Sequence, residues 1–234
     1  TISNFAPEAF VADDQSTAAG YASLFGVLYG TVKNVTIKDA KVLMPLTQGT
    51  ATGIIGGFLG TVQSNVSMPA TLENVHVVNG EVSGGRDCGL FGGQARDASL
   101  NGCTANGKVT GGNADSGGFI GRAAGHMSLE NCHSDVYLTP GQNPGSNLRY
   151  GGLIGFMATI GGTDTTRDDL IAKNCSSTGT IFNDSYSVNT AGALFGYINS
   201  SAEISECFTT LEILGAKQNE VGTSGPLGGN HGSC

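Results

Sequence analysis

Four cysteines recur at one position of a repeated pattern, and their thiols could bind a metal or form disulfides. They are Cys103, Cys132, Cys175 and Cys207. Their spacings are 29 (103 to 132), 43 (132 to 175) and 32 (175 to 207) residues. None belongs to the C-x-x-C pair that is typical of zinc sites, so we expect no metal at these thiols.

The same four thiols are predicted to be reduced and buried. Val35 and Val75 occupy the equivalent position in the two earlier repeats, which indicates an apolar site that faces inward. Parallel side chains that point the same way do not easily reach the near-perpendicular torsion of an S–S bond. The cysteines are therefore expected to pack as small hydrophobic side chains.

Carboxylates in one column across adjacent repeats would indicate an enzyme that cleaves polysaccharide. Glu73 and Glu130 share a column, but its other members are mostly not acidic, which predicts a solvated outer position: Lys33, Asn101, Lys173 and Ser205. A second group lies in one long insert: Asp164, Arg167, Asp168 and Asp169. Because it lacks the alternating spacing and the glycine turn of a calcium loop, we expect a surface loop.

Two histidines, His76 and His133, share a column one residue after the inward position, and alternation along a strand points both outward. The column is not the threonine ladder of an ice-binding surface, since it reads Thr36, His76, Thr104, His133, Ser176 and Phe208. His126 stands alone, and no G-x-S-x-G signature of a nucleophilic serine is present. We predict no catalytic residue, no metal ligand and no cofactor, and the sequence identifies no binding residue.

An internal repeat must position these residues. Six times a small residue precedes an apolar pair and a glycine, at Leu24-Phe25-Gly26, Ile54-Ile55-Gly56, Leu90-Phe91-Gly92, Phe119-Ile120-Gly121, Leu153-Ile154-Gly155 and Leu194-Phe195-Gly196. These marker glycines are 34 residues apart on average, from Gly26 to Gly196 in five steps. Glycine in a strand marks a bend or a close backbone approach, so we expect the marker at a corner. Cys88 is aligned with Gly117 and Gly151, and Cys234 is not assigned.

Two further apolar blocks follow each marker. The second block contains the cysteine column, and the third position is Val42, Val82, Val109, Leu138, Ile181 and Ile213. The blocks are short and bounded by turn formers, as strands are, and no helical periodicity occurs. The sequence predicts an all-β fold, a parallel β-solenoid (β-helix) of about six coils with three short strands per coil. We expect one domain over residues 1–234, with coils starting near residues 22, 52, 88, 117, 151 and 192.

Both ends of the chain are predicted to be partial coils, at residues 1–6 and 224–234. Ile2 is aligned with Leu72, and residues 224–229 resemble a seventh marker. Open coil ends are sheet edges that other strands can pair with. The chain is therefore expected to be a segment of a longer protein or to assemble head to tail into a filament.

Composition limits the partners. The net charge is −8, from 11 basic and 19 acidic residues, and no basic run occurs, which argues against nucleic acid. No apolar stretch approaches the roughly 20 residues of a membrane span. The first twelve residues lack the basic start and apolar block of a signal peptide.

The repeat resembles the GLUG motif over nearly the whole chain. The clearest instances are Gly151-Gly152-Leu153-Ile154-Gly155 with Asn174-Cys175-Ser176, and Gly117-Gly118-Phe119-Ile120-Gly121 with Leu129-Glu130-Asn131-Cys132. GLUG repeats are found in large bacterial surface proteins, including adhesins and the non-catalytic parts of some immunoglobulin A peptidases. The resemblance implies a β-solenoid stalk or binding region outside the cell, and it carries over no catalytic residue. The first two repeats depart from the motif at Val35 and Val75, which replace the cysteine.

We expect a structural or adhesive segment of a secreted or cell-surface protein, a rigid spacer whose loops bind host or matrix glycan or protein. The candidate contact loops are residues 63–70, 140–149, 160–169 and 182–190, and the candidate aromatic contacts are Tyr21, Tyr137, Tyr150, Phe156, Tyr186 and Tyr197. Two alternatives stay open. One is a self-assembling head-to-tail fibre subunit, whose partner is the chain itself, and the other is a β-helix enzyme that acts on polysaccharide.

Overall fold

The computed structural model describes residues 1–3, 23–43, 61–63, 70–84, 86–111, 114–141, 148–157, 169–182, 188–215, 223–225 and 228–231. Within these residues every element is a strand, and the strands form three parallel sheets. No helix in this part of the chain is long and apolar enough to cross a membrane.

The three sheets differ in size. The large sheet has 13 strands: β1 (Ile2–Ser3), β3 (Thr31–Lys38), β4 (Lys41–Leu43), β6 (Ala70–Ser83), β9 (Ala98–Asn101), β10 (Thr104–Thr110), β13 (His126–Glu130), β14 (His133–Thr139), β17 (Asp169–Lys173), β18 (Ser176–Phe182), β21 (Ser201–Ser205), β22 (Phe208–Thr209) and β23 (Glu212–Leu214). The seven-stranded sheet contains β2 (Val27–Leu28), β5 (Thr61–Gln63), β8 (Gly92–Arg96), β12 (Ile120–Ala124), β16 (Ile154–Met157), β20 (Phe195–Ile198) and β25 (Gly228–His231). The five-stranded sheet contains β7 (Cys88–Gly89), β11 (Asp115–Gly117), β15 (Leu148–Gly151), β19 (Val188–Gly192) and β24 (Thr223–Gly225).

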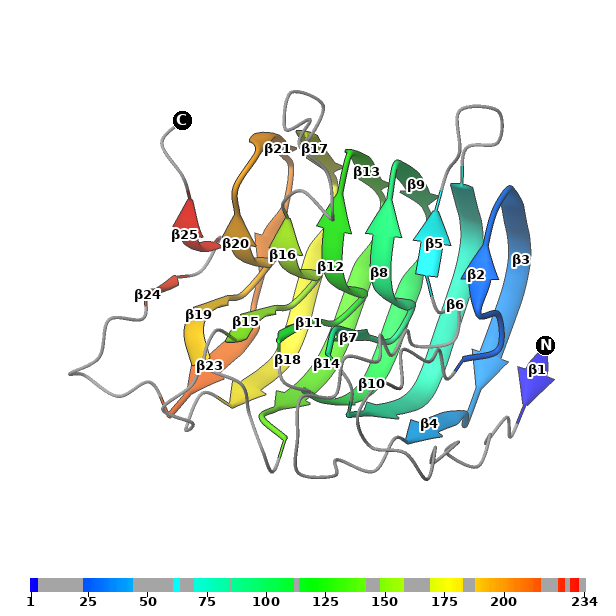
Figure 1. Cartoon of the computed structure of the whole chain (residues 1–234), viewed down its shortest axis with the longest axis horizontal. Coiled ribbons are helices and arrows are strands. Elements are labelled where there is room, and N and C mark those ends of the chain that lie inside the picture. Colours follow the sequence, from blue (N-terminus) through cyan, green and yellow to red (C-terminus); the bar gives the residue numbers. More distant parts are fainter. Residues whose placement is uncertain are drawn as a thin grey trace, which may run out of the picture.

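The chain visits the sheets in a fixed order. From β7 to β10 it runs through the five-stranded sheet, the seven-stranded sheet and then the large sheet twice, and β11 to β14 and β15 to β18 follow the same order. Equivalent strands of successive repeats lie side by side along the long axis of the molecule (Figure 1). This arrangement of parallel strands is consistent with a β-helix or β-solenoid.

The register of the large sheet confirms the third apolar column. Its members pair in order, as Val42 with Val82, Val82 with Val109 and Leu138 with Ile181. Five of the six members are fully buried, and Ile213 packs against the core at its edge. Because one apolar residue per repeat points inward at this column, the stacked repeats share a continuous core.

A left-handed residue bends the large sheet in each repeat. Asn34, Asn74, Asn131 and Asn174 have φ between 51° and 56°, a conformation that asparagine tolerates better than most residues. Asn74 donates its amide to Asn34 Oδ1 at 2.7 Å, and Asn174 donates to Asn131 Oδ1 at 2.7 Å. The asparagine that recurs in the second block therefore makes a bend and a ladder of side-chain hydrogen bonds.

The marker glycine was predicted to lie at a corner, but it lies inside a strand. Gly121, Gly155 and Gly196 belong to β12, β16 and β20. A Cβ atom on Gly121 would lie 2.5 Å from the Cys88 nitrogen and 2.7 Å from the Asp115 carbonyl oxygen. The expected close backbone approach is therefore present, and it occurs between the five-stranded and seven-stranded sheets.

The third marker is shifted by one residue from its predicted alignment. Cys88 pairs with Ser116, not with Gly117, and Gly92 pairs with Ile120. The shift brings the Phe91 ring to 4.6 Å from the Phe119 ring, and both rings are fully buried. Gly93, one residue after the predicted marker Gly92, is therefore the glycine level with Gly121.

The first strand also pairs at a different place from the predicted one. Ile2 pairs with Ile37, which pairs with Val77, so Ile2 is not aligned with Leu72. Ile37 and Val77 are inward positions of the same kind as Leu72, so a two-residue strand fits either one. Near the other end, β24 and β25 extend the two smaller sheets, with Gly225 on Gly192 and Gly228 on Phe195, as expected for a further marker.

Candidate binding groove

The column of Glu73 and Glu130 is a solvated row, as the sequence predicts. Lys33 Nζ lies 2.5 Å from Glu73 Oε2, and Asn101 donates to Glu130 Oε2 at 3.4 Å. The register places Asn101 between the two glutamates. This column therefore does not bring two carboxylates together for acid–base chemistry.

The column of His76 and His133 lies on the outer face but is half-buried. His76 Nδ1 lies 2.8 Å from Thr104 Oγ1, and its Nε2 lies 2.8 Å from Asn74 Oδ1. His133 Nδ1 lies 2.8 Å from Ser176 Oγ. The Nδ1 contact joins His76 to the next repeat, whereas the Nε2 contact lies within strand β6.

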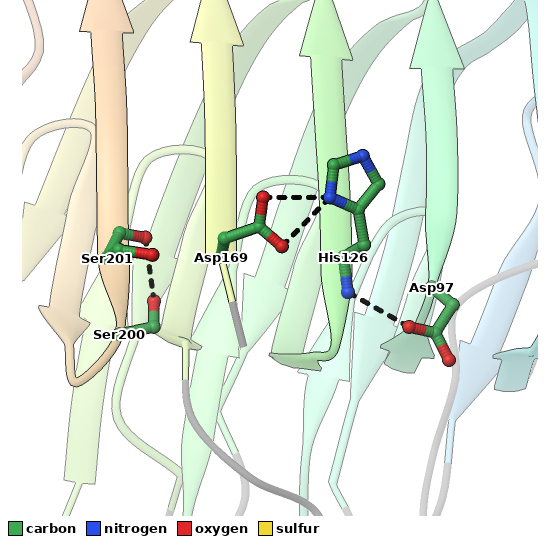
Figure 2. Close-up of polar contacts among 5 residues, drawn as sticks. All are labelled: Asp97, His126, Asp169, Ser200 and Ser201. Atoms are coloured by element: carbon green, nitrogen blue, oxygen red, sulfur yellow. Dashed lines mark hydrogen bonds and ion pairs between the residues drawn. The ribbon is translucent and has the colours of Figure 1, made fainter. Parts of the chain in front are cut away.

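His126, which the sequence leaves isolated, is paired with Asp169. Its Nδ1 lies 2.8 Å from both carboxylate oxygens, and its backbone N–H donates to Asp97 Oδ1 at 2.9 Å (Figure 2). Activation of a serine requires the imidazole next to the hydroxyl. Here Asp169 pairs with His126 on one side and Ser201 on the other, so the order is wrong for a triad. Asp164, Arg167 and Asp168 lie outside the described residues.

The cysteines that the structure describes are free thiols, as expected. Cys103, Cys132 and Cys175 are buried, and Cys207 is half-buried at the end of the column. Each thiol lies within 3.5 Å of the backbone oxygen two residues before it, as Cys132 Sγ lies 3.3 Å from the Glu130 oxygen. These contacts are those of core residues. Cys234 lies outside the described residues.

Few of the candidate aromatic contacts reach the surface. Tyr150 is fully buried and Phe156 is 7% exposed, so both belong to the interior and the prediction that they are surface contacts was wrong. Tyr197 is half-buried, whereas Tyr137 is 45% exposed on the large sheet. Tyr21 and Tyr186 lie outside the described residues, as do most residues of the four candidate contact loops.

A groove of about 430 Å³ opens beside Tyr137 on the large sheet. It is lined by polar side chains, two glycines and the tyrosine: Asp39, Lys41, Asn79, Gly80, Glu81, Asn106, Gly107, Lys108 and Tyr137. The volume falls within the size range of small-ligand sites. The sequence did not point to this groove, because nearly all of its members lie on strands, whereas the loops were expected to carry the contacts.

A β-bulge shapes the groove. Ala105 pairs with Val77 and Gly107 with Gly80, so β6 carries one residue more than β10 over this stretch. Asn79 adopts φ 53° at the bulge, and Asp39 adopts φ 52° in the preceding repeat. Bulges of this kind bend a strand and redirect side chains, often next to functional sites.

The polar residues of the groove hold one another in place. Asn79 donates its side-chain amide to Asp39 Oδ1 at 2.8 Å, and its backbone N–H donates to Asn106 Oδ1 at 3.2 Å. Lys41 Nζ lies 2.9 Å from Glu81 Oε2. Among the described residues, Lys108 and the Tyr137 hydroxyl make no hydrogen bond or ion pair. A ligand would therefore meet an ordered polar wall with a free ammonium group and an exposed ring.

A second polar cluster lies between the two smaller sheets and was missed by sequence reasoning. Asp87 and Asp115 are 0% and 1% exposed. Gln94 donates to Asp87 Oδ2 at 2.6 Å, and Arg149 donates to Asp115 Oδ1 at 3.1 Å. The Arg149 guanidinium also lies 3.9 Å from the centroid of the Phe156 ring. We refer to these five residues as the acid–arginine cluster.

The acid–arginine cluster changes the titration of its carboxyl groups. Burial raises the pKa of Asp115 to about 7, and the charge of Asp87 adds to the rise, whereas Arg149 opposes it. Burial also raises the pKa of Asp87, against the hydrogen bond from Gln94. The sequence did contain a signal, because Asp87-Cys88-Gly89 and Asp115-Ser116-Gly117 share a D-x-G pattern just before two markers.

The chain was also compared with known proteins. No family model, no curated protein and no solved structure matches it. The resemblance to GLUG repeats therefore stays a prediction. Within the described residues, no group of three His, Cys, Asp or Glu side chains could hold a metal ion.

Proposed function

We propose that this chain is a structural and adhesive segment of a secreted or cell-surface protein, and that the groove on the large sheet binds glycan. The observation that carries the proposal is the groove itself, in which an exposed tyrosine and an exposed lysine stand beside a wall of amides and carboxylates. Sugar hydroxyls require donors and acceptors in fixed positions, and sugar rings pack on aromatic faces. Both kinds of contact are available at this groove.

The proposal includes a closed β-solenoid of about six coils as the rigid spacer. The fixed order in which the chain visits the three sheets supports it, as does the in-register stacking of equivalent residues. In such a spacer the large sheet presents the same outward columns in each repeat. The resemblance to GLUG repeats agrees with a position outside the cell.

Binding is better supported than catalysis on polysaccharide. An enzyme of that class needs two carboxyl groups that both reach the scissile bond. Asp87 and Asp115 are close together, but neither is more than 1% exposed. The exposed glutamates Glu73 and Glu130 are separated by Asn101.

A glycan array tests the proposal. The chain is expected to bind a subset of glycans, and Tyr137→Ala is expected to reduce the signal about tenfold or more. The matched control is Tyr29→Ala, because Tyr29 is also 45% exposed but lies between β2 and β3, outside the groove. Binding that Tyr137→Ala leaves intact, or no binding to any glycan, would contradict the proposal.

End-to-end assembly is a second candidate, favoured by a different observation. Exposed large apolar side chains gather on the first repeat and on the late strands β21 to β23: Phe25, Val27, Tyr29, Leu43, Ile204, Phe208 and Leu214. Covering such surfaces against a second copy would be favourable. Sedimentation velocity over a range of concentrations should then show growing species, and a strictly monomeric protein would contradict this candidate.

A further inference from the structure

The groove runs across the strands and along the stacking axis. One of its two rows is formed by directly paired residues of four successive repeats, Lys41, Glu81, Lys108 and Tyr137. Neighbouring strands lie about 4.8 Å apart, so the three steps of this row span roughly 14 Å. A groove of this length and direction suits an elongated ligand better than a compact one.

The second row supplies one polar side chain per repeat. Asp39, Asn79 and Asn106 line the groove and are joined by hydrogen bonds, through the Asn79 side chain to Asp39 and through the Asn79 backbone N–H to Asn106. Asn106 donates in turn to Asp135 Oδ2 at 2.9 Å, just outside the groove lining. Because these bonds fix the side-chain orientations, donors and acceptors recur at the spacing of the repeats. Groups held in place before binding lose little conformational freedom when a ligand arrives.

The row has two unlike ends. At one end the Tyr137 ring lies 5.8 Å from the Phe182 ring, which supports it from the next repeat. At the other end Lys41 is exposed and is paired with Glu81. Lys108, which is exposed and has no ion-pair partner among the described residues, stands directly beside Tyr137. A ligand would therefore meet an aromatic surface with an adjacent cation first, and an ionic pair two repeats further on.

We infer that the ligand is a linear polysaccharide that lies along the stacking axis, with about one sugar unit per repeat. This inference rests on the proposed function, since it names the class of glycan and its direction in the same groove. The strand spacing of about 4.8 Å is close to the length of one pyranose unit in an extended chain. One sugar unit packs on Tyr137, and the following units lie over Lys108, Glu81 and Lys41.

Affinity as a function of chain length tests this inference. Isothermal titration calorimetry of the whole chain is carried out with cello-, xylo- and chito-oligosaccharides and oligogalacturonides of one to six units. For the series that binds, affinity should rise about tenfold or more from one to four units and then level off. A monosaccharide that binds as tightly as the tetrasaccharide would overturn the inference while the proposed function stands. Binding by none of the series at any length would overturn the inference, and binding on the glycan array would then decide the proposed function separately.

Variants at the two ends of the row test the direction of the bound ligand and distinguish it from a general loss of binding. Lys41→Ala should weaken the tetrasaccharide several-fold and leave the disaccharide unchanged, because the disaccharide is held at Tyr137. Tyr137→Ala should weaken both ligands. Lys38→Ala is the matched control, since Lys38 is also exposed and lies in the same repeat, outside the groove lining. Equal loss of both ligands in Lys41→Ala would overturn the proposed direction.

Discussion

The groove and the acid–arginine cluster lie in the same array of repeats, yet their charges are placed in opposite environments. In the groove, the side chains of Lys41 and Glu81 are 57% and 32% exposed. In the cluster, Asp115 is 1% exposed and its partner Arg149 is 27% exposed. Charges in water interact weakly and stay available to a ligand, whereas buried charges depend on their partners. The comparison indicates that the charges on the outer face of the large sheet stay accessible, whereas those between the smaller sheets are enclosed by the repeats that they join.

The largest expected effect is on the stability of the cluster. Arg149→Met leaves the Asp115 carboxylate buried without its partner, so the free energy of unfolding at pH 7.5 should fall by about 3 kcal/mol. Lys41→Met, which breaks the exposed pair, should change it by less than about 1 kcal/mol. Urea unfolding followed by circular dichroism measures both. Similar losses in the two variants would remove the distinction between the regions.

The pH dependence of stability should come from the cluster and not from the groove. Because the pKa of Asp115 is raised to about 7 in the folded protein, the folded state binds this proton more tightly than the unfolded state. Its contribution to stability is fully present below about pH 4 and is lost as the pH rises through about 7. In Asp115→Asn, the loss of the free energy of unfolding as the pH rises should be smaller than in wild type, by an amount on the order of 2 kcal/mol. Unchanged pH curves in Asp115→Asn would contradict the assignment.

For Tyr137 we expect a large effect on ligand binding and a small effect on stability, the reverse of the pattern in the cluster. Tyr137→Ala should weaken glycan binding about tenfold or more, about 1.4 kcal/mol, and change the free energy of unfolding by less than about 0.5 kcal/mol. Calorimetric titration and urea unfolding of the same sample measure the two quantities. A large loss of stability would place Tyr137 among the residues that hold the repeats together, against the comparison.

The smallest effect is expected from a valine in the cysteine column, which is buried like the cluster but uncharged. Val35 and Val75 fill this column in the first two repeats, so Cys132→Val should change the free energy of unfolding by less than about 1 kcal/mol. Cys132→Ser places a hydroxyl in the same apolar site and should cost more, about 1–3 kcal/mol. Thermal unfolding under reducing conditions compares them. If the serine variant were the more stable one, the column would not be an apolar core.

The sequence was sufficient to predict the repeated core, but it was not sufficient to predict the groove or the acid–arginine cluster. Residues such as Val82, Val109 and Leu138 recur because each repeat must bury an apolar side chain at the same place, and recurrence is visible in one sequence. The groove depends on one extra residue near Asn79. When the repeats are aligned by sequence, this residue is treated as a gap, so its effect on the shape of the strand is not visible. The acid–arginine cluster joins residues before and after the marker, such as Asp87, which precedes β7, and Gln94 in β8. Such contacts follow from the close approach of the two smaller sheets. The spacing of the repeats in the sequence does not predict that approach.

Parallel stacking has a mechanical consequence. Strands run across the long axis, so a force applied along this axis pulls directly on the hydrogen bonds between repeats, and all three sheets share the load. A repeat that detaches releases the 29 residues from Gly92 to Gly121, which can extend to roughly 100 Å, in place of a stacking distance of about 4.8 Å. Under tension the molecule would therefore lengthen in large steps, one repeat at a time, and the remaining repeats would stay folded.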